Sequence, residues 1–120
     1  MNRIYLSGPM TGLPDFNYPA FNAEAARLRA LGYHVENPAE NPPQQDWESY
    51  MRVAIAQMLT CDTIALLPGW VESRGALRER QVASQNGLTI TTAARIRTNR
   101  HFAEFISEYR TDTNSQVSGC

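Results

Sequence analysis

Residues 69–79, GWVESRGALRE, combine residue types that can bind an anion and attack a carbon atom. Ser73 is a suitable helix N-cap, so its hydroxyl and the free backbone N–H groups of the next turn would face outward at the positive end of the helix. Gly75 leaves room for a ligand there. Glu79 lies four residues later on the same helix face, where a carboxylate could attack a sugar carbon beside a bound phosphate. On spacing alone, a solvated Glu79 in an arginine-rich helix face is the favoured interpretation.

A second stretch with small and hydroxyl-bearing residues is SGPMTG, residues 7–12. Gly8 and Gly12 permit close approach of the backbone, while Ser7 and Thr11 offer hydroxyl groups. The stretch matches neither a dinucleotide-binding GxGxxG motif nor a Walker A loop. A plain strand-to-helix turn explains it as well as a ligand-binding loop does.

Both stretches follow short apolar runs that are typical of strands, and helical patterns separate these runs. The expected strands cover residues 3–6, 33–37, 63–67 and 88–92, and the expected helices cover residues 18–32, 47–60, 73–86 and 100–110. Asp46 is the expected N-cap of the second helix. The apolar stripe of this helix is expected to consist of Met51, Ala54, Ile55, Met58 and Leu59. Prolines and amides predict an irregular loop over residues 38–45, and residues 111–120 are expected to form a disordered tail.

This alternation of strands and helices predicts a single α/β domain over residues 1–110. We expect a doubly wound, mostly parallel sheet of four to five strands, flavodoxin-like or Rossmann-like, with helices on both faces. Such sheets bind ligands at the carboxyl ends of their strands, near the topological switch point. The loops after the first and third strands are therefore expected to converge on one site.

The composition argues against several other classes of protein. The 120 residues carry a formal net charge of −1, spread along the chain, so polymeric nucleic acid is not an expected partner. No segment reaches the roughly 18 apolar residues of a membrane span. The start is too quickly polar for a signal peptide, so we expect no membrane association and a cytoplasmic location. Two cysteines and two isolated histidines predict neither a disulfide framework nor a metal site.

The segments IYLSGPM, CDTIALLPGW and SRGALRE, in this order, resemble the nucleoside 2-deoxyribosyltransferase superfamily over about residues 2–92, in particular a branch common in phages and prophages. The spacing of Ser73, Gly75 and Glu79 is similar to that of the 2′-deoxynucleoside 5′-monophosphate N-glycosidases. The resemblance implies that Glu79 is the nucleophile and that Ser73 holds the 5′-phosphate. Relatives that act on free nucleosides tend to carry an aspartate at the serine position, so Ser73 implies a phosphorylated substrate.

The same resemblance implies roles for the first strand and the loop after it. Tyr5 would hold the Glu79 carboxylate by a hydrogen bond, although a core tyrosine with its hydroxyl satisfied is an alternative. The sugar–phosphate pocket would be lined by Ser7, Gly8, Thr11 and Gly12. Trp70, beside the site, either stacks on the base or fills the core. The resemblance also implies a homodimer or a larger homo-oligomer.

One position departs from the superfamily pattern. An aspartate usually stands eight residues before the position of Asp62, and this chain has Ala54 there. Alanine neither accepts a hydrogen bond nor shuttles a proton, so the donor to the leaving base is not identified.

The expected function is cleavage or transfer at the N-glycosidic bond of 2′-deoxynucleosides or their 5′-monophosphates. It would proceed through a covalent deoxyribosyl-glutamate, without cofactor or metal. The alternative is a non-catalytic module of the same fold that binds or sequesters a nucleotide. A purely structural interaction protein is a third hypothesis, which leaves the agreement of the site residues unexplained.

Overall fold

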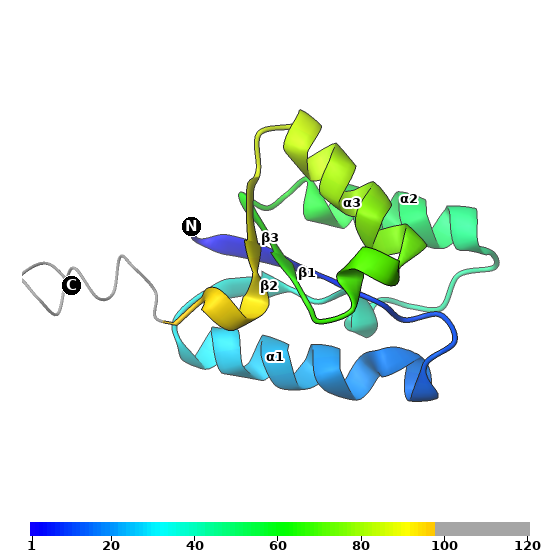
Figure 1. The fold of residues 1–120 in the computed structure, drawn as a ribbon, viewed down its shortest axis with the longest axis horizontal. Helices are drawn as coiled ribbons and strands as arrows, with labels where there is room; N and C mark the ends of the chain where they lie inside the picture. The colour runs from blue at the N-terminus through cyan, green and yellow to red at the C-terminus, as the bar shows by residue number, and fades with distance from the viewer. Residues whose placement is uncertain (98–120) are drawn as a thin grey trace, which may run out of the picture.

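A four-stranded sheet forms the centre of the fold in a computed structural model that describes residues 1–97 (Figure 1). The strands are β1 (Arg3–Ser7), β2 (His34–Glu36), β3 (Thr63–Leu66) and β4 (Thr89–Thr92). They are all parallel and run in the order β2-β1-β3-β4. The expected fold class is confirmed, with four strands. The helix expected over residues 100–110 and the tail over 111–120 lie outside the described residues.

Helices cover both faces of this sheet. Helix α1 (Tyr18–Ala30) lies on one face, and α2 (Trp47–Met58) and α3 (Arg74–Gln85) lie together on the other (Figure 1). The chain therefore winds in one direction from β1 to β2 and in the opposite direction through β3 to β4. This reversal places the topological switch point between β1 and β3. Within residues 1–97, no helix has the length and apolar content needed to cross a membrane.

The alternation of side chains along β1 divides the core into two halves. Ile4 and Leu6 pack on the α1 side, against residues such as Phe21 and Leu28. Tyr5 points to the opposite face, where it packs with residues of α2 and β3. Because side chains two residues apart share a face of a strand, Ser7 points to the same side as Tyr5. Both hydroxyl groups are thereby directed toward α3.

Helix α2 begins as predicted and ends slightly earlier. The Asp46 carboxylate accepts a hydrogen bond from the backbone N–H of Ser49 at 2.7 Å, which makes Asp46 the N-cap. Helix α2 ends at Met58, and the next residue, Leu59, is 46% exposed. The expected apolar stripe is therefore wrong at Leu59, because this residue is the C-cap and lies beyond the last turn of the helix.

Two loops contain local structure that was not expected. In the 38–45 loop, residues Pro38–Glu40 form a 3-10 turn, which corrects the expectation of an entirely irregular segment. The Asn37 side chain stabilises this turn by accepting a hydrogen bond from the N–H of Ala39 at 3.0 Å. Ahead of α1, Asp15, Phe16 and Asn17 all have positive φ angles, between 52° and 61°. Asn17 donates a side-chain hydrogen bond to the carbonyl of Pro9 at 2.9 Å and so closes that loop.

Candidate active site

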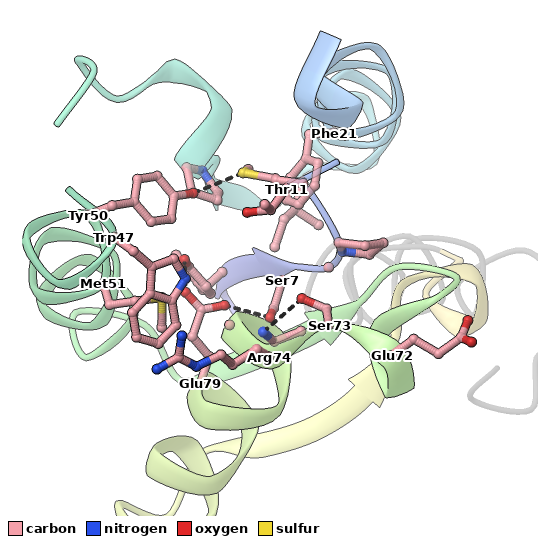
Figure 2. Close-up of a pocket in the computed structure, with 18 residues that line it drawn as sticks. Ser7, Thr11, Phe21, Trp47, Tyr50, Met51, Glu72, Ser73, Arg74 and Glu79 are labelled. Atoms are coloured by element: carbon pink, nitrogen blue, oxygen red, sulfur yellow. Dashed lines mark hydrogen bonds between the residues drawn. The ribbon is translucent and has the colours of Figure 1, made fainter. Parts of the chain in front are cut away.

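A cavity of about 330 Å³ opens at the carboxyl end of β1, beside the loop that follows β3. This volume lies within the range of about 300–1,000 Å³ that is typical of small-molecule sites. Its walls come from the end of β1 and the next loop, from the first turns of α2, and from the first turns of α3 (Figure 2). The two loops singled out from the sequence therefore converge at the switch point, as predicted.

Glu79 supplies a buried carboxylate to this cavity. Only 5% of the residue is exposed, although it lies on a helix rich in charged residues. Its Oε2 atom accepts a hydrogen bond from the Tyr5 hydroxyl at 2.7 Å, and its Oε1 atom accepts one from the Ser7 hydroxyl at 2.6 Å (Figure 2). The alternative of a solvated Glu79 is therefore wrong. The expected contact between Tyr5 and Glu79 is present, and Tyr5 is also fully buried in the core.

The surroundings of Glu79 favour its neutral form. Burial raises the pKa of Glu79 to about 7, even though the hydrogen bonds from Ser7 and Tyr5 favour the charged form. None of the arginine or histidine side chains within residues 1–97 forms an ion pair with this carboxylate. Burial and the nearby charge of Glu79 raise the pKa of Tyr5 well above its ordinary value. Tyr5 therefore keeps its proton and remains a hydrogen-bond donor to Glu79.

The first turn of α3 forms the adjacent wall. Ser73 is the predicted N-cap, and its side-chain oxygen accepts a hydrogen bond from the N–H of Ala76 at 3.1 Å. Since a serine hydroxyl can accept and donate at once, its hydrogen remains available to a ligand. Arg74 places its guanidinium 3.8 Å from the centre of the Trp47 ring, at the cavity. No carboxylate of the described residues pairs with Arg74.

Seven of the nine residues predicted for the site line the cavity. They are Tyr5, Ser7, Gly8, Thr11, Ser73, Gly75 and Glu79. Gly12 and Trp70 are not among the lining residues. Gly12 adopts a positive φ of 84° in an open turn, whereas Trp70 packs against the core beside α3, with Arg80 over its ring. Of the two roles predicted for Trp70, stacking on the base and filling the core, the structure therefore favours the core role.

Several lining residues were not found from the sequence. Trp47, Tyr50 and Met51 bring large side chains into the cavity from the first turns of α2. Their spacing of three to four residues places them on one side of this helix. That spacing is a signal in the sequence, but the apolar stripe predicted for this helix includes only Met51 of the three. Ala54, one turn further along, is fully buried among core residues and does not line the cavity.

The two glycines that line the cavity differ in how much space surrounds them. A Cβ atom added to Gly8 would lie 2.8 Å from the Cβ of Leu67. Rotation of neither side chain can relieve this clash, because the position of a Cβ atom is fixed by the backbone. We therefore expect Gly8→Ala to lower the free energy of unfolding by about 1–3 kcal/mol. At Gly75, a Cβ would meet only the flexible Met51 side chain among the described residues, with the sulfur at 3.4 Å and Cε at 4.0 Å. The matched Gly75→Ala variant should stay within about 1 kcal/mol of the wild type. Urea unfolding measures both, and equal stability of all three proteins would contradict the packing role of Gly8.

The fold and the site define a doubly wound, parallel α/β protein with a buried carboxylate in a cavity at its switch point. Within residues 1–97, no group of three His, Cys, Asp or Glu side chains can hold a metal ion. The chain belongs to the family described as "Domain of unknown function (DUF4406)", whose model matches residues 2–92 and so includes the whole cavity. No match was found among curated proteins or solved structures.

Proposed function

We propose that this protein cleaves the N-glycosidic bond of 2′-deoxynucleosides or their 5′-monophosphates, with Glu79 as the nucleophile. The observation that carries the proposal is the buried Glu79 carboxylate, held on both oxygens by Tyr5 and Ser7 in a cavity of ligand size. The resemblance of three sequence segments to the nucleoside 2-deoxyribosyltransferase superfamily supports this assignment. The parallel α/β fold is consistent with that superfamily.

In the first step, Glu79 attacks C1′ of the deoxyribose and forms an ester bond as the C1′–N bond to the base breaks. The transition state has oxocarbenium character, so the carboxylate also stabilises the positive charge that develops on the sugar. Water or a second base then attacks C1′ and releases Glu79. Two displacements at one carbon retain the configuration, as in retaining glycosidases. Tyr5 and Ser7 fix the orientation of the carboxylate, so little reorganisation is needed before attack.

The first turn of α3 supports a substrate that carries a 5′-phosphate. The helix N-terminus, the hydroxyl hydrogen of Ser73 and the guanidinium of Arg74, which forms no ion pair within residues 1–97, all favour an anion at this wall. They lie two turns or less from Glu79, close enough for one nucleotide to contact both regions.

A change at Ser73 tests this phosphate site without removing the helix cap. Aspartate is as good an N-cap as serine, so Ser73→Asp should leave the free energy of unfolding almost unchanged. Its negative charge should weaken binding of a deoxynucleoside monophosphate by about 10–100-fold, which corresponds to roughly 1.4–2.8 kcal/mol. Binding of the uncharged deoxynucleoside should not weaken. Calorimetry with the two ligands measures the difference, and equal losses for both would argue against a phosphate at this wall.

Chromatography of free base tests the proposed reaction. The wild-type protein is incubated with the common 2′-deoxynucleosides and their 5′-monophosphates, with and without a second free base. Release of base supports cleavage, and formation of a new β-deoxynucleoside identifies transfer with retained configuration. If no base is released above the rate without protein for any substrate, the proposed reaction is wrong.

A second candidate function is favoured by Ala54. Ala54 lies in the core, at the position where the superfamily usually carries an aspartate. Because alanine cannot shuttle a proton, the chain would in this case bind or sequester a nucleotide without turnover. Calorimetry that detects tight nucleotide binding, together with no base release, would favour this function.

For either function we also propose a homodimer or larger homo-oligomer from the resemblance, which sedimentation of the full chain would test.

A further inference from the structure

The proposed reaction requires a partner for the departing base. As the C1′–N bond breaks, its electron pair moves to the glycosidic nitrogen, and negative charge spreads onto the acceptor atom beside it. In a displacement, the leaving group lies opposite the nucleophile, so a useful donor must lie across the cavity from Glu79. The hydroxyls of Tyr5 and Ser7 both point to Glu79 and are not free for this task.

Tyr50 brings a further hydroxyl to the cavity from a different helix than Glu79. It lines the cavity from α2, one helical turn before Ala54. Figure 2 shows its ring extending from α2, with its hydroxyl turned sideways to a hydrogen-bond partner rather than toward Glu79. The only hydrogen bond of this hydroxyl within the described residues is donated to the Sδ atom of Met10, at 3.0 Å. A thioether sulfur is a weak acceptor, so a base oxygen or nitrogen would replace it readily.

The environment keeps the proton on Tyr50. Burial, together with the charge of Glu79 and the neighbouring Tyr18, raises the pKa of Tyr50 well above its ordinary value. Across the pH range in which Glu79 is ionised, Tyr50 is therefore a neutral donor. It can stabilise charge on a departing base by a hydrogen bond without losing its proton to solvent.

We propose that Tyr50 is a catalytic residue that donates a hydrogen bond to the departing base. This inference rests on the proposed function. Its hydroxyl leaves the Met10 sulfur and contacts the acceptor atom next to the glycosidic nitrogen. The electron pair of Glu79 forms the new bond to C1′, the pair of the C1′–N bond remains on the base, and the hydrogen bond from Tyr50 stabilises the resulting anion. Water then protonates the released base.

The dependence of the rate on the leaving base tests this role. The substrates are 2′-deoxyuridines with different 5-substituents, from methyl to nitro, in the free or 5′-phosphorylated form that the wild type cleaves. Tyr50→Phe should lower kcat by about 10²–10³-fold for the poorest leaving base, the usual cost of removing one such donor. For 5-nitrouracil, which carries the charge itself, the loss should be less than about tenfold. Tyr18→Phe, which removes a neighbouring hydroxyl outside the cavity, should preserve the wild-type dependence.

Each outcome of this experiment is decisive. A steeper dependence on the leaving base in Tyr50→Phe supports the donor role. If Tyr50→Phe lowers all rates by one factor, the hydroxyl serves only packing or folding, and the inference is overturned. Partial unfolding would also lower every rate by one factor without changing the dependence on the leaving base, so the rates are compared per folded protein, with the folded fraction taken from a thermal unfolding curve. If the wild type releases base from none of the common 2′-deoxynucleosides or their 5′-monophosphates, the proposed function fails and this inference fails with it.

Discussion

Replacing Glu79 with glutamine is expected to lower the rate of base release by roughly 10⁴–10⁶-fold, the range found when a catalytic group that acts in concert with others is removed. Glutamine preserves the size of the side chain, and its amide can still form hydrogen bonds with Tyr5 and Ser7. It lacks the negative charge and nucleophilicity needed to form the bond to C1′. Single-turnover measurements of free base, with the protein in excess over substrate, would give the rates of the wild type and the variant.

Glu48→Gln is the matched control for this change. Glu48 is an exposed residue of the first turn of α2 and does not line the cavity. Removing its charge should leave the rate within about threefold of the wild type, as for surface changes away from a site. Glu79→Gln should still bind the nucleotide, since the wall at α3 is unchanged. Equal rates in the wild type and Glu79→Gln would rule out attack by Glu79, whatever other residues contribute.

The free energy of unfolding is expected to fall by about 3 kcal/mol as the pH rises from about 4.5 to about 7.5. The cause is Glu79, whose pKa is about 7 in the folded protein, whereas its ordinary value is 4.5. The folded state therefore binds more protons than the unfolded state, and raising the pH favours unfolding. Above about pH 7.5 both states are ionised and the penalty is constant. Because attack requires the ionised form, base release should rise over the upper part of the same window.

Urea unfolding at several pH values measures this effect, and Glu79→Gln isolates it. The variant cannot ionise at this position, so its stability should lack the decline and should exceed that of the wild type at pH 8. The other carboxyl groups contribute equally to the pH dependence of the free energy of unfolding in both proteins. One of them is Glu36, whose pKa is lowered by hydrogen bonds from His34 and Gln57. Parallel stability profiles for the two proteins would show that Glu79 ionises with its ordinary pKa.

Much of the fold was predictable from the sequence because its signals are local. Short apolar runs marked the strands, and caps such as Asp46 and Ser73 marked where helices begin. The left-handed turn at residues 15–17 was not predictable in this way, because none of its residues is a glycine. Its conformation is stabilised by a distant partner, the carbonyl of Pro9, and no local pattern records that contact.

The site was predictable in part, for a similar reason. Glu79 and Ser73 lie within one short stretch, whose spacing and resemblance to known enzymes identified them. Trp47 and Tyr50 belong to the cavity only because the start of α2 packs beside the start of α3. That placement depends on how two helices cross one face of the sheet. Periodicity within α2 shows that these side chains share a face, but it does not show that a cavity lies beneath them.

The two hydroxyls that hold Glu79 come from one central strand, which limits the changes that the gene can tolerate there. Tyr5 and Ser7 are two residues apart on β1, which pairs with β2 on one side and β3 on the other. Inserting or deleting a single residue before Tyr5 in this strand would turn both hydroxyls toward α1 and leave the carboxylate without a partner. The surface loops can change length without this penalty. Insertions and deletions in descendants of this chain should therefore be confined to the loops.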